Sequence, residues 1–366
     1  MATKSRVVES SFRIGCGRYI QENGALSRTG DEVARLRCKK PFVLGGTTAL
    51  SITREKVAKS LADSGMEGVF YEFKGFCVPD HCQAVTERED FRACDIVIGI
   101  GGGVVMDAAK LCAVLGGLPV ICIPTSSATC AACAPLSVTY NEIGQPLGTK
   151  HHTREVNCVL VDMDVLSTQP PRLFKSGVYD SLAKRMETRQ RIIGKDENEI
   201  DIGLRSSYEL SIFLYDRLLN DFDKACADLE KGICSKAVYD CVWLTLCLTG
   251  AVSGMARGSN QTAVAHKIYE SSRALFPEPV RRYLHGEVVA VGLIVQLAYN
   301  GSMEEAERFR DDMKRRGMAV SLTEMGVEGS DANRTLLYEK MLASSAMAGT
   351  TEEEHQQLMT ALRMII

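Results

Sequence analysis

The sequence predicts a chain in two halves: an α/β half built on a parallel sheet, then a half made of helices alone. In the first half, short apolar runs alternate with helical patterns, which is typical of parallel strands covered by helices. After Pro170-Pro171, strand patterns almost vanish and long helical patterns follow. We therefore expect one domain over residues 1–168 and a second over residues 169–366, with a cleft between them.

The first half opens with an irregular, glycine-containing segment over residues 12–26 and then alternates regularly. Its expected strands are short runs rich in valine, isoleucine and leucine, and glycine or proline punctuates several of their ends. Strands are expected at residues 41–44, 69–73, 96–100, 118–123, 137–140 and 159–161, and helices at residues 31–38, 51–64, 80–88 and 104–116. Ligands of such sheets bind beyond the carboxyl ends of the strands.

The second half is dominated by helical patterns. Helices are expected at residues 205–219, 237–255, 262–275, 286–299, 303–315 and from residue 336 onward. Another helix is expected to begin at Asp180. The longest uncharged stretch, residues 241–256, is shorter than a membrane span and is interrupted by threonine, serine and glycine, so we expect a core helix there.

The composition is that of an ordinary globular protein, with 45% hydrophobic and 24% charged residues in a chain of 366. A net charge of −3 offers no general attraction to nucleic acid or anionic membranes, so the expected partner is a small molecule. Many of the 14 cysteines lie in apolar runs, and no apolar signal segment opens the chain. These features favour reduced, buried thiols in a cytoplasmic protein.

Residues 96–110 are the most informative stretch. A buried strand runs into Gly101, Gly102 and Gly103, and a helix follows. Glycines let a phosphate approach the backbone, and the first N–H groups of the helix have no partners of their own, so this pattern predicts an anion cradle. The usual dinucleotide fingerprint would need glycine where Val104 or Met106 stands, so a phosphate site of another kind is favoured over it. A tight turn without a ligand is the alternative.

A second constellation lies in the helical half. His266 and His285 each fall near the start of an expected helix, as does Asp180. Two imidazoles and one carboxylate with open positions suit a catalytic Zn²⁺ or Fe²⁺. Because the three residues are far apart in the chain, a capping aspartate and two partly buried histidines remain the alternative.

Together these segments resemble the iron-containing, or group III, alcohol dehydrogenases, in their glycerol dehydrogenase-like branch. The resemblance runs over most of the chain, and its motifs appear in family order. They are residues 19–24, 101–110, 124–140, 179–184, 265–266 and 285–290. The segment 128–137 looks most like members that reduce 2-oxo acids to hydroxycarboxylates.

The resemblance implies a Rossmann-like α/β domain followed by an all-α domain, the architecture of dehydroquinate synthase. It also implies reversible hydride transfer between NAD(P) and a CH–OH carbon, in a homo-oligomer. Asp180, His266 and His285 become the expected metal ligands. The expected cofactor-binding residues are Gly101, Gly102, Gly103, Val104, Asp107, Thr125, Ser126, Leu136 and Tyr140.

The chain departs from the family pattern in three places. Lys184 replaces a fourth ligand histidine of some iron-dependent members, which implies a three-ligand site. Tyr269 replaces a further histidine of many relatives and so changes the substrate wall. Cys130 replaces the aspartate that polyol-using relatives place beside the substrate hydroxyls.

Cys130 therefore enters the expected catalytic set with the three ligands. An aspartate there would repel an anionic substrate, whereas a neutral thiol would not, which favours 2-oxo acids. The basic side chains that could hold a substrate carboxylate are Arg281, Arg282, Lys150 and Lys184.

Several alternatives stay open from the sequence. The turn at residues 45–47 lacks the acidic residue that holds a ribose 2′-hydroxyl, so NADPH as well as NADH is considered. Cys130 and Cys133 form an isolated Cys-x-x-Cys, for which redox chemistry is disfavoured. His151-His152 is expected in a solvated loop rather than in a surface metal site. Polyol oxidation, a dehydroquinate synthase-like lyase and a cofactor-binding protein without turnover are the alternative functions.

Overall fold

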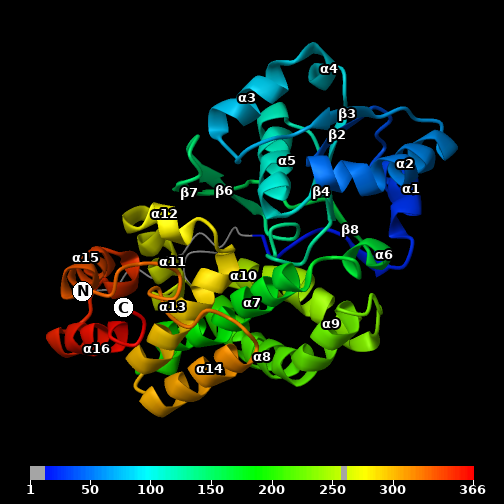
Figure 1. Ribbon diagram of the computed structural model, residues 1–366. Helices are drawn as coiled ribbons and strands as arrows, with labels where there is room; N and C mark the ends of the chain where they lie inside the picture. The colour runs from blue at the N-terminus through cyan, green and yellow to red at the C-terminus, as the bar shows by residue number, and fades with distance from the viewer. Residues whose placement is uncertain (1–12, 257–261) are drawn as a thin grey trace.

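The computed structural model describes residues 13–256 and 262–366 (Figure 1). Its first half holds a six-stranded sheet in the order β1-β8-β5-β4-β2-β3, and every pairing in it is parallel. The strands are β1 (Tyr19–Glu22), β2 (Pro41–Gly45), β3 (Val69–Glu72), β4 (Ile96–Gly101), β5 (Val120–Pro124) and β8 (Cys158–Asp162). Strands β2, β4, β5 and β8 are buried throughout, as their continuous apolar runs predict.

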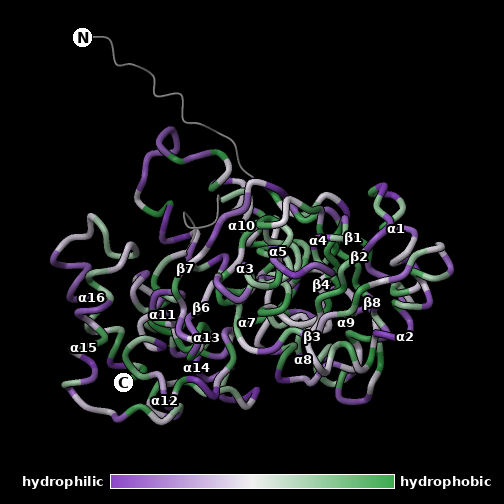
Figure 2. Tube along the Cα trace, turned by 90° about the horizontal axis from the view of Figure 1, so that it is seen from above, coloured by the Kyte–Doolittle hydropathy of each residue, from purple (hydrophilic) through white to green (hydrophobic). Residues whose placement is uncertain are grey.

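Helices cover both faces of this sheet, with α1 and α2 on one side and α3 and α5 on the other (Figure 1). The helices of this half are η1 (Ala25–Arg28), α1 (Thr29–Arg35), α2 (Thr47–Asp63), α3 (Pro79–Glu87), α4 (Glu89–Arg92), α5 (Gly103–Gly116) and α6 (Met163–Leu166). A separate antiparallel hairpin pairs β6 (Leu136–Tyr140) with β7 (Pro146–His151). Hydrophobic residues are concentrated around β2, β4 and β8 (Figure 2).

The order of the strands fixes where a ligand can bind. From β2 the chain moves outward to β3, whereas from β4 it moves the other way to β5. Such a reversal between neighbouring strands opens a crevice at their carboxyl ends. The glycine turn after β4 and the Gly45-Gly46 turn after β2 both lie at this switch point.

The second half is helical. Its helices are α7 (Pro171–Ile192), η2 (Glu197–Glu199), α8 (Ile202–Leu229), α9 (Lys236–Trp243), η3 (Leu244–Leu248), α10 (Thr249–Met255), α11 (Val264–Leu275), α12 (Pro277–Val280), α13 (His285–Tyr299), α14 (Met303–Arg315), α15 (Asp331–Leu342), η4 (Ser345–Met347) and α16 (Glu352–Leu362). Pro171 starts α7 at a position where a missing N–H costs nothing. Helix α13 is apolar on all sides and is the buried centre of this half.

The two halves meet where α7 passes the loop after β5. A Cβ on Gly177 would lie 1.7 Å from the carbonyl oxygen of Ser127, so only glycine permits this approach. The side chain of Gln169 accepts a hydrogen bond from the Ser127 backbone N–H at 2.8 Å. These contacts bring the helical half against the carboxyl edge of the sheet.

The structure corrects four expectations. The segment over residues 12–26 is not irregular throughout, because Tyr19–Glu22 forms an edge strand beside β8; Phe12 itself lies outside the described residues. Asp180 sits inside α7 rather than at a helix start, and α8 is longer than residues 205–219. Strand β7, for which no strand was expected, completes the hairpin.

The uncharged stretch 241–256 is a core helix, as expected, although a π-helical turn interrupts it at Leu244–Leu248. With α9 and α10 it forms a helix over Lys236–Met255 that is long and apolar enough to cross a membrane. About two thirds of its most apolar window, 67%, is buried inside the protein. Its hydrophobicity is therefore explained by packing in the helical half. All 14 cysteines are free thiols.

Candidate active site

Three helices bring the expected metal ligands together. Asp180 projects from the middle of α7, His266 from the first turn of α11, and His285 is the first residue of α13. A Cβ on Gly286 would lie 1.8 Å from the Ser176 carbonyl oxygen, so α13 can begin this close to α7 only with glycine there. The close packing places His285 beside Asp180.

The three side chains form one compact cluster. Oδ1 of Asp180 lies 3.3 Å from Nε2 of His266 and 3.3 Å from Nε2 of His285. One ligand atom from each residue lies within 4.8 Å of the others. Within the described ranges, Asp180 Oδ1 is buried without a hydrogen bond. A buried oxygen of this kind, faced by two ring nitrogens, fits a coordinating cation.

Glu187, which the sequence analysis did not single out, orients His266. It lies two turns after Asp180 on α7 and is fully buried. Its carboxylate accepts hydrogen bonds from the backbone N–H groups of Ala263 and His266 at 2.8 and 2.9 Å, and from Nδ1 of His266 at 2.6 Å. Because a carboxylate only accepts, Nδ1 carries the proton and Nε2 is free to bind a metal.

The titration behaviour of the cluster follows from these contacts. Burial opposes ionisation of Asp180, but the two imidazoles and Lys184 hold the pKa of its carboxyl well below the usual range. Burial disfavours a charged His266, yet Glu187 and Asp180 outweigh it and raise the pKa of the ring to about 9. A divalent cation on Nε2 would replace that proton, as binding to histidine requires.

A ring contact and a capped helix start hold His285 in place. The His285 ring meets the Tyr269 ring edge-on, with the centroids 4.3 Å apart. Glu287, two residues further along α13, accepts from the Leu284 backbone N–H at 2.7 Å and pairs with Arg172 at 2.6 Å. Tyr269 thus packs directly beside the candidate metal site, and its effect on the substrate wall stays a prediction.

The glycine cradle lies at the carboxyl end of β4. Gly101 ends the strand, Gly102 caps α5, and Gly103 begins it. A Cβ on Gly103 would lie 2.8 Å from Thr129 Oγ1, and one on Gly102 would lie 3.6 Å from Ser126 Oγ. The structure thus brings the glycines, the first N–H groups of α5 and two hydroxyls to one place, which fits a diphosphate.

The other expected cofactor residues come from α5, the loop after β5 and strand β6. Val104 lies in the first turn of α5, and Thr125 follows β5, where its backbone N–H donates to the Gly101 carbonyl at 3.0 Å. Leu136 and Tyr140 are the first and last residues of β6. The Tyr140 hydroxyl interacts with that of Tyr269, which links the hairpin to the wall beside His285.

Asp107 is turned into the protein rather than toward the surface. Burial raises the pKa of its carboxyl, against the effect of Lys110, whose Nζ lies 3.0 Å away. Lys110 also donates to the carbonyl oxygens of Ala131 and Ala134 at 2.6 and 3.0 Å, and to that of Leu136. This pair therefore fixes the loop over residues 128–136 onto α5.

That loop carries Cys130, which is half-buried. Burial raises the pKa of the Cys130 thiol, although the ammonium of Lys184 opposes the rise, so the thiol is neutral at pH 7. Lys184 lies one turn after Asp180 on α7 and is only 5% exposed. Within the described part of the chain, its Nζ makes no hydrogen bond or ion pair.

The remaining basic candidates lie at the surface. Arg281 is 67% exposed and pairs with Glu278 at 2.9 Å, while Arg282 and Lys150 are exposed. Among the four candidates, Lys184 is the buried one, and its charge acts on Asp180, Glu187 and Cys130.

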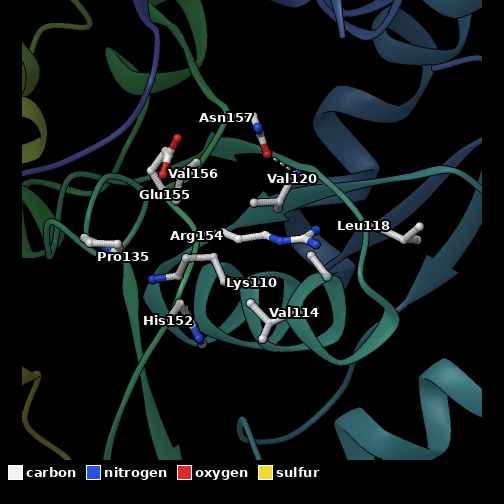
Figure 3. A pocket seen from close by; sticks show the side chains of 11 residues that line it. Lys110, Val114, Leu118, Val120, Pro135, His152, Arg154, Glu155, Val156 and Asn157 are labelled. Carbon is white, nitrogen blue, oxygen red and sulfur yellow. Dashed lines mark hydrogen bonds between the residues drawn. The ribbon is translucent and has the colours of Figure 1, made fainter. Parts of the chain in front are cut away.

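A small pocket lies behind α5, lined by Lys110, Leu118, His152, Arg154 and Asn157 among others (Figure 3). Its interior of about 10 Å³ has room for at most one water molecule, so it is no ligand site.

The pair His151-His152, expected in a solvated loop, is only partly exposed to solvent. His151 is exposed, but His152 is half-buried and bonds to Ser137 Oγ at 2.8 Å.

A phosphate cradle on a parallel sheet, together with a buried cluster of one carboxylate and two imidazoles, is typical of dinucleotide- and metal-dependent oxidoreductases. Comparison with known proteins narrows the class, because residues 16–163 match the model of the family described as iron-containing alcohol dehydrogenase. The first half of the chain thus matches this family, and the relatives and solved structures that resemble the chain over most of its length include glycerol dehydrogenases.

The relatives it resembles are dehydrogenases. It is 27% identical to hydroxycarboxylate dehydrogenase A of Escherichia coli K12 over 331 residues, which cover 90% of this chain and 88% of the relative. It is 28% identical over 342 residues to glycerol dehydrogenase of Thermotoga maritima, covering 88% and 87% of the two chains. The structure of glycerol dehydrogenase from Schizosaccharomyces pombe matches with a TM-score of 0.83 and 25% identity, covering 95% of this chain and 88% of that one.

These findings confirm an enzyme that acts on alcohol groups with a nicotinamide dinucleotide and a divalent metal. The residues present fit both groups: three nitrogen and oxygen ligands converge on a buried point, and the glycine cradle lacks the side chains that would fill it. The relatives named above are dehydrogenases, which favours hydride transfer over the lyase and over a binding protein without turnover.

Proposed function

We propose that this enzyme reduces 2-oxo acids to 2-hydroxycarboxylates, using Asp180, His266 and His285 to hold the metal. The observation that carries the proposal is Lys184, a buried cation that makes no ion pair within the described residues, near a neutral thiol at Cys130. When bound, the cation supplies Lewis acidity to the substrate oxygen and the nicotinamide supplies the hydride.

The charge balance of the site favours an anionic substrate. The carboxylates of Asp180 and Glu187 balance a divalent ion, and the ammonium of Lys184 leaves one positive charge over. In this buried setting an unbalanced charge is costly, and a substrate carboxylate would neutralise it. An aspartate at position 130 would neutralise it instead and would suit an uncharged polyol.

Each side chain then has a defined task. Glu187 holds His266 with Nε2 free, and Tyr269 packs on His285 and limits the substrate space. Lys184 binds the substrate carboxylate, which orients the carbonyl carbon toward the cradle side. Gly101, Gly102 and Gly103, with Ser126, hold the diphosphate.

Steady-state kinetics of Lys184→Met and Cys130→Asp test the proposal, with a panel of 2-oxo acids, aldehydes and glycerol. Lys184→Met should lower kcat/KM for 2-oxo acids by about 100-fold, mainly through KM, because a buried charge pair is lost. Cys130→Asp should weaken 2-oxo acid reduction and improve glycerol oxidation. Arg281→Met, which removes a surface guanidinium paired with Glu278, is the control and should change nothing.

Metal content is measured in each variant, so that loss of the ion is not mistaken for loss of substrate binding. An unchanged substrate preference in both variants, with the metal retained, would contradict the proposal. Oxidation of glycerol is the second candidate, since several relatives are named glycerol dehydrogenase. The same panel decides between them, because a glycerol dehydrogenase would favour glycerol before any substitution.

A further inference from the structure

The carboxylate of Glu72 stands at the carboxyl end of β3, beside the first turn of α2. Its Oε1 accepts a hydrogen bond from the Thr47 hydroxyl and lies 3.3 Å from Nζ of Lys74. The side chain is 42% exposed, and across residues 13–256 and 262–366 its Oε2 has no hydrogen bond. Glu72 is thus a fixed carboxylate with one oxygen free to accept from a ligand.

The strand register places this carboxylate in line with the cradle. Gly45 of β2 pairs with Glu72 on one side and with Ile100 of β4 on the other. Ile100 immediately precedes the cradle glycines. Because neighbouring strands lie about 4.8 Å apart, Glu72 is about 10 Å from the cradle, across the Gly45-Gly46-Thr47 turn. That separation is on the scale of a nucleoside extending from a diphosphate.

The position of the metal ligands fixes which way a dinucleotide must run. Helix α7, which carries Asp180, packs on the loop after β5, at Ser127. A nicotinamide that reaches this cluster from the cradle extends over β5. The adenosine then extends the opposite way, over β2 and β3, the side of the sheet away from α7 and α8 (Figure 1).

We infer that Glu72 binds the adenosine ribose of the dinucleotide and selects NADH over NADPH. A carboxylate accepts hydrogen bonds from the ribose hydroxyls and repels a 2′-phosphate. The turn at residues 45–47 has no acidic residue, and Glu72 of the neighbouring strand β3 takes that role, oriented by the Thr47 hydroxyl. The inference concerns the cofactor and holds whichever alcohol or oxo acid the enzyme uses.

Dissociation constants of NADH and NADPH, measured by calorimetry on the metal-loaded enzyme without substrate, test this inference. The wild type should bind NADH at least about tenfold more tightly than NADPH. Glu72→Gln should shrink that ratio by about tenfold or more, because the repulsion is lost and Lys74 is released toward the phosphate. Thr47→Val, which removes only the orienting hydroxyl, should shift the ratio in the same direction by less.

Glu67→Gln is the matched control, since it removes an exposed carboxylate just before the other end of β3 and should leave the ratio unchanged. Equal binding of the two cofactors by the wild type would overturn the inference, as would an unchanged ratio in Glu72→Gln. Neither result depends on the substrate, so a failure here is distinguishable from a failure of 2-oxo acid reduction.

Discussion

Replacing Glu187 with glutamine tests how the metal site is built, because it changes one buried contact and almost no volume. The Oε2 atom of Glu187 accepts from Nδ1 of His266 at 2.6 Å, and Oε1 accepts from two backbone N–H groups. In one orientation the glutamine amide places a donor against Nδ1–H; in the other it places a donor against the two backbone N–H groups.

The ring can escape the first clash only by moving its proton to Nε2, and then it cannot bind a metal. Loss of such a carboxylate–histidine contact typically lowers metal affinity about 10–100-fold, which is about 1.4–2.7 kcal/mol. Since Glu187 is fully buried, water cannot replace the lost acceptor. We expect the weaker binding to appear for Zn²⁺ and Fe²⁺ alike.

The assay is competition with a chelator of known affinity, at constant pH, on wild type and Glu187→Gln. Glu353→Gln, the same change at an exposed position on α16, is the control and should match the wild type. Thermal unfolding of each apoprotein separates loss of affinity from loss of fold. A folded Glu187→Gln enzyme that binds the metal within twofold of the wild type would refute the assigned role.

Two other changes probe the scaffold. Lys110→Met should lower the free energy of unfolding by about 3–5 kcal/mol in denaturant titrations, because it leaves Asp107 buried without its partner. The double variant Lys110→Met/Asp107→Asn should recover part of that lost stability. Burial lowers the pKa of His152 to about 4. Below about pH 6.5 the unfolded chain therefore binds a proton at His152 that the folded chain does not bind. The free energy of unfolding should fall by about 1–2 kcal/mol between pH 6.5 and 4, allowing for partial exposure. His152→Gln should flatten that slope, and an unaltered slope would exclude His152 as its source.

The sequence predicts the parallel sheet well because its central strands are continuous apolar runs that nothing else explains. Strand β1 was not predicted, because it is short and holds two polar residues in YIQE. Its hydrogen bonds are completed only by pairing with residues 159–162, far along the chain. The position of Asp180 was predictable in principle, since Pro170-Pro171 marks the true start of α7.

The site likewise contains residues that the sequence predicts and residues that it does not. Asp180, His266 and His285 come together as the family resemblance implies. Glu187 has only its two-turn spacing from Asp180 as a local signal, and its partner His266 is 79 residues away. Glu72 has no signal at all until β3 is known to lie beside β2.

The central claim is that one divalent ion is held by Asp180, His266 and His285 opposite the glycine cradle. Elemental analysis of wild type and Asp180→Ala, after equilibration with Zn²⁺ or Fe²⁺ and removal of free ion, tests it most directly. We predict a single ion per wild-type chain, and neither bound ion nor turnover in the folded variant. An Asp180→Ala enzyme that keeps its ion, or turns over fully without one, would contradict the assignment.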